Sequence, residues 1–535
     1  MAQIDSLLDG LTAPMLVFLA GATAAYLLTT RVWAWYRLRH IKGPLWAGWT
    51  DLWLIYTTAR CEMLESCAKL CQQYGPLVRI STNYVVCGDA AEIRRIWAVR
   101  STFDRADWWK GFQLDPPNDC SVSLRDYDIH HALRVKLLPG YNGRGVEGVH
   151  ESIDAGVARF VRLIEKKYLS TETEYRPVDF AKKMQYHTID LVSNIAFGEP
   201  FGFVEADQDL WGYIRQVHDS QPVFQLVCLM PWLGTLLQSP VGRLLQPSDK
   251  DVVRKRLAFP AYRVVLVSRN RWLQNVLDPT RLNAQIFSVL GSGKVSLKPR
   301  PNKRRWSRCK NATWPFPKTQ ILVGEADIHR HSLAGADTTS SAITAIIAQV
   351  ITRSSLYRRL QQEIDEAVVE GRISSPVADA EARKLPFLQA CIKEALRMWP
   401  PINSAMPKVS NEDAVVCGTH IPAGTCIAWA AKPCLCDPKV FGEDSEMYRP
   451  ERWLLAEGSN LTAMENAVDL CFGAGKWVCL GRQLAYFKIN KTLVELFCRF
   501  DFAVVDIAKP ITKVTAGATL FSDFKLRITE RSVHA

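Results

Sequence analysis

The chain contains 15 cysteines, yet it lacks the paired spacing that zinc ribbons and disulfide frameworks require. No CxxC pair is matched by a second pair, so the cysteines indicate a protein of a reducing compartment. The chain also lacks internal repeats, and no obvious linker divides its 535 residues. These absences exclude a small stapled scaffold and favour one large domain with appendages.

Acidic residues are absent from one basic stretch in the middle of the chain. It carries eight cations, namely Lys294, Lys298, Arg300, Lys303, Arg304, Arg305, Arg308 and Lys310. They make up two thirds of the net charge of +12, so the basicity is local and we expect no nucleic-acid partner. The surrounding segment, 285–318, lacks periodicity and is predicted as an atypical basic insertion. The alternatives for it are a solvated loop, sequence normally removed by splicing, and a surface that contacts acidic lipid or a reductase.

Charged residues are also absent from Gly10 to Thr30, and this stretch is predicted as a transmembrane helix. As a helix its 21 residues span about 31 Å, close to the hydrocarbon thickness of a bilayer. Aromatic residues and cations follow, which places the body on the cytoplasmic side. A cleaved signal peptide is the alternative, but Asp5 and Asp9 precede the apolar run and no cationic side chain does. The predicted parts are an anchor over 10–30, a basic and aromatic linker with a Gly-Pro hinge over 31–44, and a domain over 45–530.

The body is predicted to be mainly α with small peripheral β-sheets, because helical periodicity dominates it and strand patterns are short. The clearest predicted helices cover 319–352, 355–371, 386–398 and 482–499. The predicted strands fall around 77–88, at 413–430 and in the last 35 residues. The stretch that follows 430 and ends near 471 is rich in Asp, Glu, Pro and Arg, and we expect it to be a loop.

One cysteine stands in an unusual frame. The stretch "FGAGKWVCLGRQLA", residues 472–485, places Cys479 among glycines and just before a predicted helix. We expect Gly473, Gly475 and Gly481 to let the backbone adopt positive φ and approach a partner closely. Backbone N–H groups and the start of the helix would stabilise a thiolate, which suits an axial ligand of haem iron. An ordinary buried thiol is the alternative.

A second motif, Ala-Gly-Ala-Asp-Thr-Thr, occupies residues 334–339 of the predicted helix over 319–352. Gly335 weakens a helix by roughly 0.5–1 kcal/mol relative to alanine, and Thr338 can bond back to a carbonyl and bend the helix. A small residue, the acid Asp337 and a hydroxyl at one distortion suit an oxygen pocket that needs protons. The alternative is a helix interior with routine polar residues.

Two further motifs predict a buried ionic cluster. Glu394 and Arg397 are three residues apart on a predicted helix, and Pro450-Glu451-Arg452 supplies a second arginine. An exposed pair would stabilise the helix by only about 0.2–0.5 kcal/mol. A buried Arg–Glu–Arg cluster would cost about 3–5 kcal/mol to break, and it could fix the loop that carries Cys479.

In this order the four motifs resemble the cytochrome P-450 superfamily of haem-thiolate monooxygenases. The family pattern FxxGxRxCxG is matched at Phe472, Gly475, Cys479 and Gly481, and [AG]Gx[DE]T[TS] at 334–339. The Glu-x-x-Arg and Pro-Glu-Arg motifs complete the set. The resemblance covers roughly 45–530, and the anchor ahead of it is similar to that of fungal microsomal members of secondary metabolism. One departure is Trp477, which stands where the family has an arginine.

The resemblance implies roles for particular residues. Cys479 would be the axial ligand of haem b, and Thr338 with Asp337 would relay protons during oxygen activation. Glu394, Arg397 and Arg452 would be structural. The residues expected to contact the haem are His130, Arg134, Lys408 and Phe472, with Arg134 and Lys408 near its propionates. Lys476 would supply the cation that Trp477 removes.

The resemblance also implies the reaction and its setting. An apolar small molecule would be oxidised with dioxygen and with electrons from an NADPH-dependent flavoprotein reductase, which would dock near Lys476 and Arg482. Trp108, Trp109 and Phe112 are candidate walls of the substrate site. The protein would be a single-pass protein of the endoplasmic reticulum. Two alternatives remain: a haem-thiolate dehydratase or isomerase that uses no dioxygen, and a single-span membrane adaptor without haem.

Overall fold

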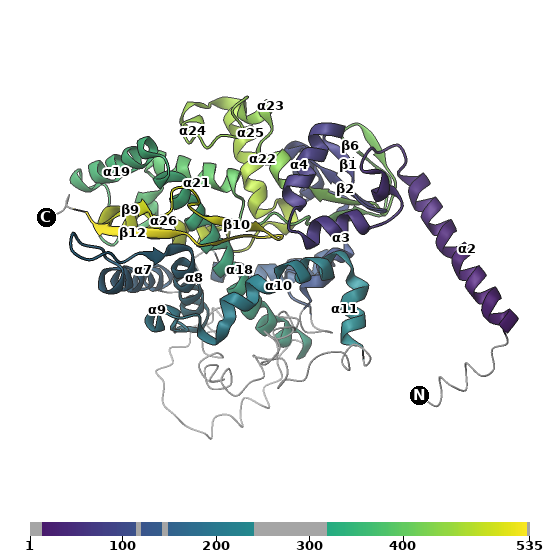
Figure 1. Ribbon diagram of the computed structural model, residues 1–535, viewed down its shortest axis with the longest axis horizontal. Coiled ribbons are helices and arrows are strands. Elements are labelled where there is room, and N and C mark those ends of the chain that lie inside the picture. The colour runs from purple at the N-terminus through teal and green to yellow at the C-terminus, as the bar shows by residue number, and fades with distance from the viewer. Residues whose placement is uncertain (1–12, 114–118, 142–147, 240–317, 532–535) are drawn as a thin grey trace, which may run out of the picture.

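A computed structural model describes residues 13–113, 119–141, 148–239 and 318–531 of the chain (Figure 1). It is mostly helical, with small sheets, as the sequence predicts. The predicted basic insertion lies outside the described residues except at Lys318.

The first described helix, α2 (Ala13–Arg37), projects away from the body (Figure 1). Its segment Val17–Arg37 is long and apolar enough to cross a membrane, and none of it is buried. The helix continues past residue 30, so the first half of the predicted linker is helical. Arg79 explains where it ends, since its guanidinium donates to the carbonyls of Ala34 at 2.9 Å and Trp35 at 3.2 Å.

Arg79 attaches this helix to the body through further hydrogen bonds. Its guanidinium also donates to the carbonyls of Gly48, Ser81 and Thr82 at 3.0–3.1 Å, which makes five acceptors in all. Gly43 packs directly on the same residue, because a Cβ there would lie 2.0 Å from the Arg79 carbonyl oxygen. The predicted Gly-Pro hinge is therefore held against a strand.

The largest sheet has five strands in the order β1-β2-β8-β5-β3. Its strands are β1 (Leu77–Arg79), β2 (Tyr84–Cys87), β8 (Cys426–Trp429), β5 (Lys408–Ser410) and β3 (Phe103–Arg105). Only β2 and β8 pair in parallel. The register of β3 on β5 places Arg105 opposite Lys408. Two like charges face each other in this way only at a cost, so the pair marks a site of interest.

Three smaller sheets lie elsewhere in the described residues. One has the order β4-β12-β9, from Val178–Asp179, Lys525–Glu530 and Phe500–Val504. The hairpin β10–β11 pairs Thr512–Thr515 with Thr519–Ser522, and β6–β7 pairs Ala414–Val416 with Thr419–Ile421. The strands predicted near 413–430 and in the last 35 residues are confirmed.

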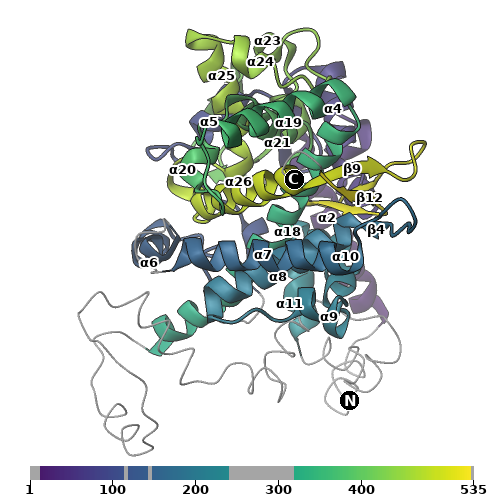
Figure 2. The same ribbon diagram turned by 90° about the vertical axis from the view of Figure 1, so that its left-hand side faces the viewer.

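The long helix α18 (Lys318–Ile351) runs through the middle of the molecule (Figure 2). It packs on α8 (Phe180–Phe197) from one side and on α21 (Pro386–Met398) and α26 (Arg482–Arg499) from the other. Residues 339–350 of α18 are all buried, which their alanine, isoleucine and valine content explains. Of these, α18, α21 and α26 match the predicted helices 319–352, 386–398 and 482–499 within a residue.

Other helices complete the body around this centre. They are α3 (Leu52–Ala59), α4 (Met63–Tyr74), α5 (Ala90–Trp97), α6 (Tyr127–Tyr141), α7 (Val149–Lys167), α9 (Phe203–Ala206), α10 (Tyr213–Leu229), α11 (Pro231–Gln238), α19 (Ser354–Val369) and α20 (Asp379–Ala382).

The prediction of a loop that ends near 471 is wrong, because this segment contains four helices. They are α22 (Ala431–Leu435), α23 (Pro438–Phe441), α24 (Arg452–Leu455) and α25 (Gly458–Asp469). Three of them have only four or five residues, and the longer α25 is largely polar but buries Met464, Ala467 and Val468 on one face. Tertiary packing therefore stabilises helices that local preference does not predict.

Candidate active site

Cys479 lies between the short 3-10 helix η6 (Gly475–Trp477) and the start of α26. Its backbone N–H donates to the carbonyl of Phe472 at 2.6 Å, which closes the loop. The side chain is exposed, yet the surrounding protein desolvates the thiol and raises its pKa. The N–H of Gly481 and the charges of Arg134 and Lys488 lower that pKa in part. The sulfur is thus accessible while still surrounded by protein.

Two of the three glycines in this loop behave as predicted. Gly473 and Gly475 have φ of +74° and +59°. A Cβ at Gly475 would also lie 2.1 Å from the carbonyl oxygen of Trp97, so only glycine fits there. The prediction for Gly481 is wrong, since its φ is −85°, a value open to any residue. It precedes α26 as the N-cap.

The segment 334–339 of α18 shows the predicted back-bonding. Thr338 Oγ1 donates to the carbonyl of Ala334 at 2.6 Å, and Thr339 Oγ1 donates to that of Gly335 at 2.8 Å. Ala334 is exposed and Asp337 and Thr338 are half-buried, unlike the buried residues that follow. Burial raises the pKa of Asp337 to about 7. This carboxyl therefore changes protonation state near neutral pH.

One lysine joins this segment to the helix that follows Cys479. Lys488 of α26 is 3% exposed and its ammonium group donates to the carbonyl of Gly335 at 2.8 Å. The two motifs, separated by more than a hundred residues, are thus brought together by α26. The sequence analysis missed Lys488. Its position between the apolar Phe487 and Ile489, on a helix that buries much of its surface, is the signal that could have found it.

Two buried cations, Arg105 and Lys408, face each other on the paired strands β3 and β5. Lys408 is 2% exposed, and Arg105 is also buried. Among the described residues, neither Lys408 Nζ nor Arg105 Nε has a hydrogen-bond partner. Arg105 Nη1 donates to the carbonyls of Ser121 and Leu124, at 2.7 Å each. Burial lowers the pKa of Arg105 to about 9 and that of Lys408 well below its usual value. Unfilled donors on two facing buried cations indicate a place for an anion.

The indole ring of Trp477 packs against both of these cations. Its ring lies 4.2 Å from the Arg105 guanidinium and 4.8 Å from Lys408 Nζ, both within cation–π range. His130 packs on the same ring at 4.3 Å, and its Nδ1 is buried without a partner. Burial, followed by the charges of Arg105 and other nearby cations, lowers the pKa of His130 to about 3, so the imidazole is neutral. Trp477, which departs from the family pattern, is thus part of the packing of this site.

The remaining predicted contacts are arranged differently. Arg134 Nη1 donates to the carbonyl of Val478 at 2.7 Å, which ties α6 to the cysteine loop. Lys476 is paired with Asp104 at 2.6 Å, so its charge is already engaged. Arg105 was missed by the sequence analysis. The alternation in β3 was a usable signal, since Phe103 and Arg105 are both buried and the residue between them is half-buried.

The candidate substrate walls are buried against each other. Trp108 and Trp109 are 0% and 8% exposed and meet edge to face at 5.1 Å. Phe112 packs on Phe224 of α10 at 4.9 Å. Trp109 also lies 4.4 Å beneath the Arg105 guanidinium. This cluster therefore borders the cationic region.

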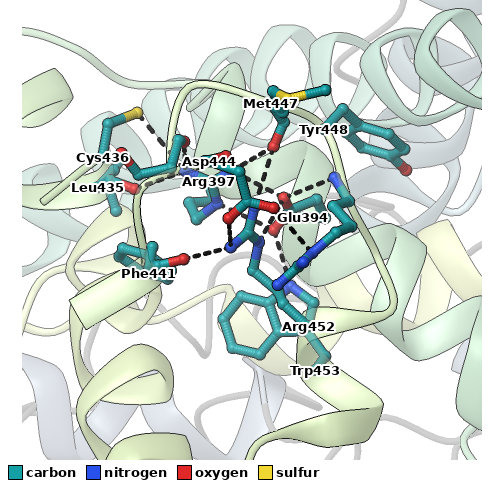
Figure 3. Close-up of polar contacts among 12 residues, drawn as sticks. Glu394, Arg397, Leu435, Cys436, Phe441, Asp444, Met447, Tyr448, Arg452 and Trp453 are labelled. Atoms are coloured by element: carbon teal, nitrogen blue, oxygen red, sulfur yellow. Dashed lines mark hydrogen bonds and ion pairs between the residues drawn. The ribbon is translucent and has the colours of Figure 1, made fainter. Parts of the chain in front are cut away.

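Glu394 is the centre of a buried ionic cluster that joins α21 to the segment around α24 (Figure 3). Its Oε1 accepts from Arg397 Nη2 at 2.7 Å, Arg452 Nε at 3.0 Å and the backbone N–H of Arg449 at 2.9 Å. Its Oε2 accepts from Arg397 Nε and Trp453 Nε1, each at 2.9 Å. Glu394 and the two arginines are at most 3% exposed. The structure brings together the three residues that the sequence proposes as a cluster.

The chemistry of these groups fits haem. An accessible cysteine sulfur can bind the iron as a thiolate, and the facing cations Arg105 and Lys408 can donate hydrogen bonds to the two carboxylates of the porphyrin. Both cations are buried with unfilled donors, a costly arrangement that a bound anion would relieve. Fold and site together define a protein of the haem-thiolate class.

Comparisons with known proteins agree with this assignment. Residues 326–522 match the family model described as cytochrome P-450. The chain is 30% identical over 540 residues to cytochrome P-450 monooxygenase ABA1 of Pyricularia oryzae, covering 99% of each chain. It is 29% identical over 500 residues to aba1 of Botryotinia fuckeliana, covering 92% of each. It is 27% identical over 506 residues to gsfF of Penicillium aethiopicum, covering 93% of this chain and 94% of that protein.

The chain belongs to the cytochrome P-450 family. The predicted resemblance is therefore confirmed, and so are the predictions of a monooxygenase and of a haem held by a cysteine thiolate. The relatives are fungal monooxygenases, which supports a member of the type found in fungal secondary metabolism.

Proposed function

We propose that the protein is a membrane-anchored monooxygenase that oxidises an apolar small molecule in fungal secondary metabolism. The observation that carries this proposal is the accessible sulfur of Cys479, together with the unfilled donors Arg105 Nε and Lys408 Nζ of two buried cations. The catalytic domain over 45–530 would lie on the cytoplasmic side of the endoplasmic reticulum, with α2 as its single span. The exposed, apolar surface of α2 supports this placement.

Cys479 would hold the haem iron, and four residues would hold the rest of the group. Lys408 and Arg105 offer free donors to its carboxylates, His130 presents a buried Nδ1, and Arg134 fixes the cysteine loop through Val478. Phe472 would flank the group from the same loop. When bound, haem activates dioxygen so that one oxygen atom enters the substrate and the other leaves as water.

Asp337 and Thr338 would move protons on the side of the site formed by α18. With a pKa of about 7, Asp337 can both accept and donate a proton at neutral pH. The Thr338 hydroxyl donates to the carbonyl of Ala334, which leaves its oxygen free to accept a hydrogen bond. Glu394, Arg397 and Arg452 would act as structural residues that stabilise the segment leading to the cysteine loop.

An NADPH-dependent flavoprotein reductase would supply the electrons from the cysteine side. The two cations predicted to attract it are both paired, Lys476 with Asp104 and Arg482 with Asp469, so their positive charge is partly offset. Docking would then depend on the shape of this surface and on other cations around it.

Product analysis with a supplied reductase tests the proposal. The full chain, expressed with an NADPH-dependent reductase and fed apolar substrates, should give a product that contains one atom of isotopically labelled dioxygen. Product formed without dioxygen or NADPH would favour the dehydratase or isomerase alternative. A purified protein without haem colour would favour the membrane adaptor.

Replacement of Cys479 by alanine tests the ligand. The variant should lose the red-shifted absorbance band of the reduced carbon-monoxide complex, because no thiolate remains to bind the iron. Cys471→Ala is the matched control from the same loop, since its sulfur contacts the carbonyl of Leu396 instead. A band that survives in Cys479→Ala would reject the assignment.

A further inference from the structure

Helix α26 contains two buried lysines that are satisfied in different ways. Lys491 and Lys488 are each 3% exposed. Lys491 forms an ion pair with Asp154 at 2.6 Å. Lys488 forms no ion pair within the described part of the chain, and its one hydrogen bond there goes to the carbonyl of Gly335, at 2.8 Å. A neutral carbonyl compensates a buried ammonium group poorly, so Lys488 lies there at a cost in stability.

The charged groups around Lys488 do not provide a carboxylate. His187 of α8 is buried, and its pKa is lowered to about 3 by burial and then by the charges of Arg159 and Lys488, so it is neutral. Burial lowers the pKa of Lys488 to about 7, and the group that opposes this shift is Cys479. Among the described residues no carboxylate pairs with this ammonium group, and the carbonyl of Gly335 is its hydrogen-bond acceptor there.

Gly335 lies in contact range of the lysine side chain. A Cβ at that position would make ordinary van der Waals contacts, 3.7 Å from Lys488 Nζ and 3.5 Å from Val192. The same carbonyl also accepts the hydroxyl of Thr339 at 2.8 Å. Lys488 therefore contacts α18 in the turn that carries Asp337 and Thr338.

We propose that Lys488 is a positioning residue for the monooxygenase reaction: its hydrogen bond to the carbonyl of Gly335 holds the turn of α18 that carries Asp337 and Thr338. The inference rests on the proposed role of Asp337 and Thr338 in moving protons. Because the hydrogen bond of Lys488 holds the segment that delivers protons, it favours product over released peroxide.

Lys488→Met tests this proposal in the full-length, haem-loaded protein. It keeps the length of the side chain and removes both its charge and its hydrogen bond. The variant should keep the red-shifted carbon-monoxide band, form several-fold less product per NADPH consumed, and release correspondingly more peroxide. Lys491→Met is the matched control: it breaks a buried ion pair on the same helix and should lower thermal stability without changing the product formed per NADPH.

Two further variants decide the result if Lys488→Met binds haem poorly. Lys488→Gln and Lys488→Arg each keep a hydrogen-bond donor and should recover much of the wild-type yield per NADPH. The proposal is wrong if a haem-binding Lys488→Met variant gives the wild-type yield per NADPH, or if haem-binding Lys488→Gln and Lys488→Arg variants both lose that yield although they keep a donor. Either outcome would leave the proposed function intact, because the function fails only if Cys479→Ala retains the thiolate band.

Discussion

Replacement of Glu394 by glutamine should lower the free energy of unfolding by about 3–5 kcal/mol, the usual cost of breaking a buried ion cluster. Glu394 is fully buried and accepts five hydrogen bonds, three of them from the guanidinium groups of Arg397 and Arg452. Glutamine has nearly the same shape but no charge. The change would leave the buried Arg397 without its counter-ion and Arg452 with Asp444 alone, and it would turn an amide N–H toward other donors.

An exposed ion pair on the same helix provides the scale for this effect. Lys393, also in α21, pairs with Glu465 at 2.6 Å, close to the 2.7 Å of the buried pair. Its two side chains are 34% and 47% exposed, and exposed pairs contribute only about 0–1 kcal/mol. Glu465→Gln should therefore be nearly neutral, although its ion pair is as short as the buried one.

The assay compares both variants in the full-length protein in detergent. Urea unfolding followed by circular dichroism gives the difference in unfolding free energy, and the rate of haem loss at a fixed temperature gives a second measure. A Glu394→Gln variant that unfolds within about 1 kcal/mol of Glu465→Gln would refute the argument that burial sets the cost of this cluster.

Three other predictions concern the site. Thr338→Ala should keep haem but release more peroxide per NADPH consumed, whereas Thr338→Ser should not; equal coupling in the two would contradict the proton role. Because burial raises the pKa of Asp337 from 3.8 to about 7, the folded state favours the neutral carboxyl, and its contribution to stability is lost as pH rises toward and through 7. The stability of the wild type relative to Asp337→Asn should therefore fall between acidic and mildly alkaline pH in chemical unfolding, and a constant difference would argue against the shift. Lys408→Met should weaken haem binding in a titration of the haem-free protein, while Lys476→Met, whose charge is paired with Asp104, should change it little; the reverse order would reverse the assignment.

The sequence predicted the long helices well because their ends are marked. Proline begins α21 and glycine precedes α26, and both helices start and end at the predicted residues. The short helices α22 to α25 could not be predicted in the same way. A helix of four residues such as α24 has no stability of its own, and Arg452 within it is held by the distant Glu394 and by Asp444.

The same difference between local motifs and distant contacts decides which residues of the candidate site could be predicted. Cys479 and the Glu394 cluster could be predicted because each belongs to a local motif. For Arg105 and Lys488, local patterns indicate burial at most. They do not show the group opposite each, which is Lys408 on the paired strand β5 for Arg105 and the carbonyl of Gly335 on α18 for Lys488. The failed prediction for Gly481 has a related cause, since a glycine can precede a helix without adopting positive φ.

The hydrogen bonds of Arg79 have a consequence for the proposed membrane anchor. Two of them join the last turn of α2 to strand β1 of the five-stranded sheet, and the other three hold Arg79 to Gly48, Ser81 and Thr82 of the body. With α2 in lipid, the axis of that helix and the orientation of the catalytic body would change together. A thinner bilayer, which increases the tilt of a long apolar helix, should then rotate the whole body toward the lipid surface by a similar angle.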